Sequence, residues 1–212
     1  IVLDGVFSHT GSDSRYFNRE GRYGEGGAYR DPNSPYRSWY DFDSKYKGGY
    51  RSWWGFETLP EVDEETPSYV EFITGEGGVI DTWLRRGAAG FRLDVADELP
   101  DEFIEKVRTA VKRVGPDKFL LGEVWEDATT KFGFDKRRTY LLGKGLDSVM
   151  NYPFKNAVLG FVCGRDAGQT MTDILSICEH YPAPALDTAL NFLSTHDTER
   201  ALTVIADEPA TG

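Results

Sequence analysis

Short apolar segments alternate with helical stretches along this sequence, and the alternation limits the fold more than any other feature. The segments predicted as strands are residues 1–8, 90–98, 119–125, 146–152 and 190–196. Helical spacing of apolar residues separates several of them, as in the stretches from Ser68 to Gly87 and from Pro100 to Gly115. Strands joined by helical crossovers form parallel sheets. The sequence therefore predicts an α/β protein with a parallel sheet.

Polar residues close each predicted strand. They are Ser8 with His9, Asp94, Glu123, Asn151, and His196 with Asp197. In a (β/α)8 barrel, polar residues at the carboxyl ends of several strands build the active site. The rival is a doubly wound open sheet, but no glycine-rich phosphate loop follows any of these strands. Because five strands cannot close a barrel, we expect an incomplete TIM barrel.

The segment GFRLDVADE, from Gly90 to Glu98, carries charge into the interior. Successive strand side chains point to opposite faces, which predicts one face made of Phe91, Leu93 and Val95 and another made of Arg92, Asp94 and Ala96. A buried arginine and aspartate are costly unless they pair or serve a polar site. A structural ion pair in the barrel core and a functional site are both open readings of this segment.

The net charge and the composition of the chain exclude some classes of binding partner. The net charge of -11 is spread over 212 residues, which argues against nucleic acid and anionic membrane surfaces. No stretch approaches the roughly 20 apolar residues that span a membrane. A neutral substrate fits this chain better.

Three acids, Asp94, Glu123 and Asp197, are among the polar residues assigned to the ends of the second, third and fifth predicted strands, and they indicate carboxylate chemistry. Glycoside hydrolysis needs two carboxyl groups, one ionised and one protonated. Each acid also has a structural explanation when taken singly, such as helix capping by Asp197. Together, and with His9 and His196 beside them, they favour a catalytic site.

Residues 10–66 form a long segment with almost no helical periodicity. A segment of this length is expected to be functional or a small domain of its own. We predict a barrel made of residues 1–9 and 67–212, with residues 10–66 as an insertion. Most of its aromatic residues are expected to pack the insertion's own core, and a minority to offer flat faces to sugar rings.

Four motifs resemble the signature regions of the α-amylase superfamily, glycoside hydrolase family 13. They are DGVFSH (residues 4–9), GFRLDVADE (90–98), LLGEVWED (120–127) and FLSTHDTER (192–200), and they occur in the order and at the approximate spacings of that family. WWGFETLPEVDE (residues 53–64) stands where a fifth region lies. The resemblance covers nearly the whole chain. It implies strands three to seven of a TIM barrel, with a domain B insertion after strand three.

The resemblance also implies roles for individual residues. Asp94 matches the catalytic nucleophile, Glu123 the general acid/base and Asp197 the aspartate that stabilises the transition state. The residues implied in substrate binding or its support are Asp4, His9, Arg92, Glu98, Trp125 and His196. The mechanism implied is a retaining double displacement.

The motifs LDVADE, WWG and GEVWED resemble the neopullulanase, cyclomaltodextrinase and maltogenic amylase group. This implies hydrolysis of α-1,4 bonds, and in many members also α-1,6 bonds, in maltooligosaccharides, cyclodextrins or pullulan. The alternatives are an α-amylase or oligo-1,6-glucosidase of the same superfamily, and a non-catalytic glucan-binding or transporter-associated relative. The last would be expected to lack at least one of the three carboxylates.

Cofactor, assembly and location follow from the same resemblance. Ser8 stands in place of a usual asparagine, and Asp97 and Glu98 in place of lysine and histidine, which weakens the case for the family's calcium ion. We expect no cofactor and assign no metal ligand. Members of the group are commonly cytoplasmic dimers, so we expect a cytoplasmic enzyme that forms a homodimer or a swapped assembly. The chain opens directly on an apolar strand, and residues 1–212 alone are expected to be an internal fragment with negligible activity.

Overall fold

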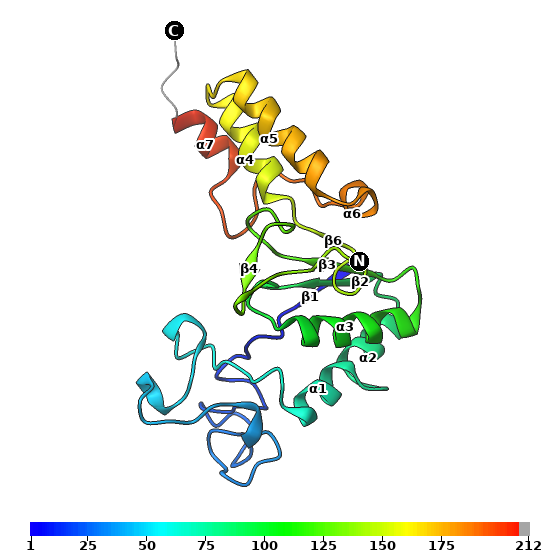
Figure 1. Ribbon diagram of the computed structural model, residues 1–212. Helices are drawn as coiled ribbons and strands as arrows, with labels where there is room; N and C mark the ends of the chain where they lie inside the picture. Colours follow the sequence, from blue (N-terminus) through cyan, green and yellow to red (C-terminus); the bar gives the residue numbers. More distant parts are fainter. Residues whose placement is uncertain (208–212) are drawn as a thin grey trace. The chain divides into compact units, whose positions relative to one another are not determined.

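The computed structural model describes residues 1–207. The chain divides into two compact units, Ile1–Phe119 and a second that begins at Leu120. Both units contain short parallel strands and helices (Figure 1). The alternation of strands and helices predicted from the sequence is therefore present in each.

The first unit is built on two parallel strands, β1 (Val2–Gly5) and β2 (Gly90–Leu93). Asp4 lies beside Arg92 in their register. Gly90 lies so close to the backbone of Phe119 that a Cβ atom on Gly90 would be 2.0 Å from the Phe119 carbonyl oxygen. No larger residue fits at this position without a backbone shift.

Three helices lie side by side next to these strands (Figure 1). They are α1 (Pro67–Thr74), α2 (Val79–Arg85) and α3 (Asp101–Val114). The buried face of α3 consists of Phe103, Ile104, Val107, Ala110 and Val111. These residues recur at helical spacing, and the prediction of a helix after Pro100 is confirmed.

The helix predicted to begin at Ser68 is broken into two. Gly75 and Gly78 pack so tightly against carbonyl oxygens of α1 that a Cβ atom at either would lie within 3 Å of one of them. The chain therefore turns there before α2 begins. Thr66 is the N-cap of α1, and the Ser68 hydroxyl accepts a hydrogen bond from the Trp39 indole at 2.9 Å.

Residues 10–66, all described by the structure, contain no α-helix. Their helical turns are η1 (Arg37–Trp39), η2 (Lys47–Gly49) and η3 (Trp53–Gly55). Phe17 is fully buried at the centre. Its ring lies 4.7–5.8 Å from the rings of Tyr29, Tyr40, Phe42 and Tyr50. This segment is thus held together by the packing of its aromatic rings and not by helices or strands. The prediction was that most of its aromatic residues pack its own core, and these rings do so.

Glu64, near the end of this segment, is a half-buried carboxyl group. Burial raises the pKa of Glu64 to about 8, and the nearby charge of Glu61 adds to the effect. Between its ordinary pKa of 4.5 and about 8, the folded state keeps the proton that the unfolded state releases. Stability therefore falls as pH rises through this window and is unaffected by Glu64 below it.

Replacing Glu64 with glutamine is expected to stabilise the protein at pH 8 by up to about 4 kcal/mol and to have little effect at pH 4, because the neutral amide carries no ionisation penalty. Urea unfolding at the two pH values measures the difference. Glu65→Gln, at the exposed neighbouring residue, is the matched control. Equal effects of Glu64→Gln at both pH values would contradict the raised pKa.

The second unit contains the parallel strands β3 (Phe119–Gly122) and β6 (Ser148–Val149). Its helices are α4 (Tyr152–Val162), α5 (Ala167–His180), α6 (Ala183–Asp187) and α7 (Ala201–Asp207). Helices α4 and α5 pack against each other along their lengths (Figure 1). No helix within residues 1–207 has the length and apolar character needed to cross a membrane.

Two features of this unit differ from the predicted pattern. The strand expected over residues 190–196 is reduced to a parallel bridge between Met150 and Leu190, because the residues after Leu190 join no ladder in the described part of the chain. A hairpin, β4 (Phe132–Gly133) and β5 (Lys136–Arg137), stands between β3 and β6 in the sequence and forms a separate two-stranded sheet. Both residues of its turn have positive φ angles, 52° and 57°, as a type I′ hairpin turn requires.

Candidate active site

Arg92 on β2 binds two carboxylates at the end of the first strand pair. Its Nη1 atom donates to Asp4 Oδ1 at 2.7 Å and to Asp94 Oδ1 at 2.5 Å. The Arg92 side chain is 11% exposed and that of Asp94 20%, so salt and solvent screen the pair weakly. A guanidinium at this distance favours the ionised form of a carboxyl group. The arrangement suits Asp94 to act as a carboxylate.

Asp94 stands directly after β2 and begins a turn. The strand predicted to run from Gly90 to Glu98 therefore ends at Leu93, and the predicted alternation of faces does not continue to Val95 and Ala96. Val95 has a φ angle of 39°, which is a true outlier for a β-branched residue. Such strain costs about 1–3 kcal/mol and clusters at functional sites. The turn leaves the Asp94 carboxylate at the carboxyl end of the strand.

His9 stacks on Trp53 at the same end of this unit. The two ring centroids are 5.3 Å apart and the rings are inclined by 29°. Ser8 Oγ and His9 Nδ1 are hydrogen-bonded at 3.0 Å. Burial lowers the pKa of His9, and the charges of Asp94 and Glu98 offset this only in part. At neutral pH the imidazole is therefore neutral and offers one donor and one acceptor.

Glu98 binds two indoles. Trp53 Nε1 donates to Glu98 Oε2 at 2.7 Å, and Trp54 Nε1 donates to Glu98 Oε1 at 2.9 Å. The sequence indicated Glu98 as a substrate residue but did not connect it with these indoles, which lie 45 and 44 positions earlier in the chain. Contacts of such separation carry no periodic signal in a single sequence.

In the second unit, Glu123 lies just after β3 and is 3% exposed. Trp125 Nε1 donates to Glu123 Oε1 at 2.9 Å, and the Tyr152 hydroxyl lies 3.4 Å from the same oxygen. The Trp125 and Tyr152 rings stack at 4.7 Å with 14° between their planes. Tyr152 was not among the predicted site residues, although it ends the predicted strand over residues 146–152 and could have been found there. Aromatic rings and two donors thus surround the carboxyl group.

His196 and Asp197 lie together in a turn of the second unit. His196 Nε2 is 3.3 Å from Asp197 Oδ2, and the two side chains are 75% and 35% exposed. The backbone N–H of Asp197 donates to Thr195 Oγ1 at 3.2 Å. Neither in this turn nor elsewhere in residues 1–207 do three or more His, Cys, Asp or Glu side chains form a group that could hold a metal ion.

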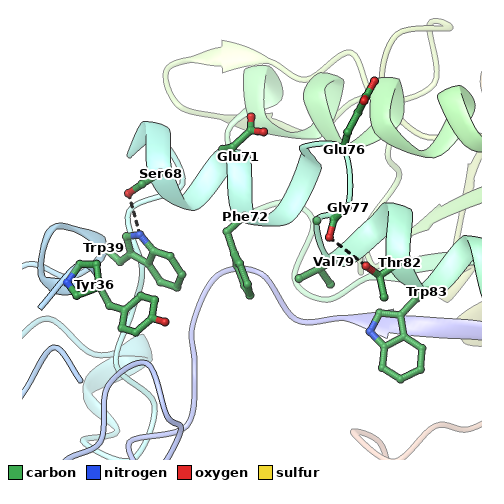
Figure 2. A pocket seen from close by; sticks show the side chains of 12 residues that line it. Tyr36, Trp39, Ser68, Glu71, Phe72, Glu76, Gly77, Val79, Thr82 and Trp83 are labelled. Atoms are coloured by element: carbon green, nitrogen blue, oxygen red, sulfur yellow. Dashed lines mark hydrogen bonds between the residues drawn. The ribbon is translucent and has the colours of Figure 1, made fainter. Parts of the chain in front are cut away.

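A hollow of about 570 Å³ lies beside α1 and α2, and Figure 2 shows its lining. The aromatic residues that line it are Tyr36, Trp39, Phe72 and Trp83. None of the predicted site residues contributes to this hollow. Asp4, Arg92 and Asp94, which are joined by hydrogen bonds, do not line this hollow.

Comparison with known proteins identifies the family of this chain. A family model described as "Alpha amylase, catalytic domain" matches residues 1–211. The chain belongs to this family. The amylopullulanase of Thermoanaerobacterium saccharolyticum is 36% identical over 235 residues, which cover 96% of this chain and 18% of that protein. A cyclomaltodextrinase from a Bacillus species is 32% identical over 96% of this chain and 35% of its own length.

Solved structures extend the likeness to the fold. The protein Ttha1563 from Thermus thermophilus matches with a TM-score of 0.79 and 32% identity over 97% of this chain and 44% of that chain. The cyclic alpha-maltosyl-(1-->6)-maltose hydrolase from Arthrobacter globiformis matches with a TM-score of 0.82 and 27% identity over the same shares. The predicted α-amylase-type fold, an incomplete (β/α)8 barrel, is confirmed. The chain spans about a fifth to a third of the length of the curated relatives described above.

Proposed function

We propose that the protein carrying this chain is a retaining α-glucan hydrolase. Its substrates are maltooligosaccharides, cyclodextrins or pullulan, cleaved at α-1,4 and also at α-1,6 bonds. Membership of the alpha-amylase family supports the reaction class. The names of its relatives, amylopullulanase, cyclomaltodextrinase and neopullulanase, support the substrate class.

The observation that carries the proposal is the pair formed by Arg92 and Asp94 at the end of β2. In the proposed reaction, an Asp94 oxygen attacks the anomeric carbon while Glu123 gives a proton to the departing glycosidic oxygen. The bond to the leaving sugar breaks as the glycosyl-Asp94 ester forms. Glu123, now ionised, then takes a proton from water, whose oxygen attacks the anomeric carbon and releases Asp94. The two inversions together retain the α configuration.

The remaining predicted residues support this cycle. Asp197 stabilises the oxocarbenium-like transition state by its negative charge, and His9 and His196 bind hydroxyl groups of the cleaved sugar. Asp4 supports Arg92, because it accepts a hydrogen bond from the same guanidinium nitrogen that binds Asp94. Trp125 orients the Glu123 carboxyl group through its indole N–H.

The proposal also covers the domain organisation, the cellular location and the assembly of the protein. Residues 10–66 act as the insertion domain of the catalytic barrel, and their own aromatic core supports this reading. The relation to the cyclomaltodextrinase and neopullulanase group supports a cytoplasmic enzyme that assembles as a homodimer.

Hydrolysis of maltoheptaose followed by proton NMR tests the function with the full-length protein. A retaining enzyme is expected to release product first as the α-anomer, before mutarotation adds the β-anomer. Pullulan, β-cyclodextrin, starch and isomaltose in parallel separate the proposed group from an α-amylase and an oligo-1,6-glucosidase. Initial release of the β-anomer contradicts the mechanism, and binding of glucans without any hydrolysis supports the non-catalytic alternative.

A further inference from the structure

The exposed Trp54 and Phe56 form an aromatic surface with the half-buried Trp53, and one carboxylate binds the indoles of both tryptophans. Trp54 is 76% exposed and Phe56 57%. Trp53 lies between them and His9, with ring centroids 5.6 Å from Trp54, 6.4 Å from Phe56 and 5.3 Å from His9. The rings are inclined to Trp53 by 28–34°. We call Trp53, Trp54 and Phe56 the aromatic strip.

The backbone beneath the strip is strained. Trp54 has a φ angle of 51° and Gly55 one of 80°. A bulky residue in the left-handed region is a true outlier, and such conformations persist only where the surroundings hold them. This conformation leaves the Trp54 indole in solvent beside the exposed Phe56 ring, and a contiguous exposed apolar patch is typical of a binding surface.

Glu98 binds the indoles of both tryptophans. Each of its carboxylate oxygens accepts one indole N–H, from Trp53 at 2.7 Å and from Trp54 at 2.9 Å. These are charge-assisted hydrogen bonds, which are stronger than neutral ones. They fix both indoles against rotation about their side-chain bonds. The loss of side-chain freedom is thus completed before any ligand arrives, which strengthens binding.

We propose that Glu98 is a positioning residue that holds Trp53 and Trp54 as a preorganised strip for the glucose units of a longer α-glucan, beyond the unit that His9 contacts. Trp53 is the member of the strip that contacts the His9 ring, and the exposed Trp54 and Phe56 rings contact Trp53 in turn. Flat aromatic faces suit the apolar C–H faces of sugar rings. The inference rests on the proposed function and adds to it a preference for chain length.

The test compares maltotriose with maltoheptaose as substrates of the full-length protein. Trp54→Ala is expected to lower the ratio of kcat/KM for maltoheptaose to that for maltotriose by about fivefold to tenfold. Glu98→Gln is expected to lower it in the same direction. The glutamine side chain has one acceptor oxygen and an NH₂ group, so it cannot accept from both indoles in this geometry.

A double-mutant cycle connects the two residues. Trp54→Phe keeps a stacking ring but removes the N–H that Glu98 binds. In the Trp54→Phe background, Glu98→Gln is expected to lower the ratio less than in the wild-type protein, because one of the two bonds is already absent. Additive effects of the two substitutions would show that Glu98 does not act through Trp54 and would overturn the inference.

Trp83→Ala is the matched control. Trp83 is also an exposed tryptophan, 46% accessible, but it lies on α2 and lines the separate hollow of Figure 2. This variant is expected to keep the wild-type ratio. A wild-type protein that hydrolyses neither oligosaccharide would refute the proposed function itself. A wild-type protein that hydrolyses both, with a ratio unchanged in Trp54→Ala and Glu98→Gln, would refute the strip alone.

Discussion

Asp94→Asn is expected to lower kcat on maltoheptaose by at least about 10⁴-fold. The asparagine side chain has nearly the shape of aspartate, and its amide oxygen can still accept the hydrogen bond that Arg92 Nη1 donates to Asp94. It carries no negative charge, however, and cannot form the glycosyl ester. The loss is therefore expected in turnover and not in folding.

Initial rates and calorimetric binding of maltoheptaose measure the two effects separately in the full-length protein. Binding is expected to persist because the other residues of the site remain. Asp117→Asn, at an exposed residue, makes the same chemical change away from the site and is expected to leave the rate unaltered. More than a few per cent of residual activity in Asp94→Asn would refute the nucleophile assignment.

Glu123→Gln is expected to lower kcat on maltooligosaccharides by about 10²–10⁴-fold, the usual contribution of a general acid/base. The amide cannot protonate the departing sugar oxygen. A glycosyl fluoride leaves without a proton, so the first step with α-maltosyl fluoride is expected to lose much less of its rate than the same step with maltoheptaose. The difference between the two substrates identifies proton donation as the role that is lost.

Rapid-mixing measurements of the first turnover provide this comparison. Glu126→Gln is the matched control, because Glu126 is exposed and pairs with Lys131 at 2.6 Å while Glu123 is buried. Equal loss with the fluoride and with maltoheptaose in Glu123→Gln would contradict the role of proton donor in the first step. It would leave Glu123 as a residue that positions the substrate.

Much of the fold could be predicted because local patterns reported it. The apolar face of α3 recurs at helical spacing, and the short apolar runs before Asp94 and Glu123 became β2 and β3. Prediction failed where the backbone conformation of a short segment depended on tertiary packing. The break between α1 and α2 follows from glycines that fit only against the carbonyl oxygens of α1, and no propensity shows that contact.

The strand over residues 190–196 failed for a related reason. Its apolar residues are those of a strand, but a strand exists only where a neighbour offers hydrogen bonds, and Leu190 alone pairs with Met150. The end of β2 at Leu93 has a different cause. Val95 adopts a left-handed conformation that a β-branched residue does not choose locally, so the tertiary surroundings impose it.

The family, the α/β class and the identity of the acidic residues could be inferred from the order of residues, because motifs and periodicities are properties of neighbouring positions. The partners of those residues required the folded chain. Glu98 was identified as a residue of the site from its motif, but its two bonds to Trp53 and Trp54 join segments more than forty positions apart. Such pairings arise only when β1 and β2 lie side by side and bring the loops after them together.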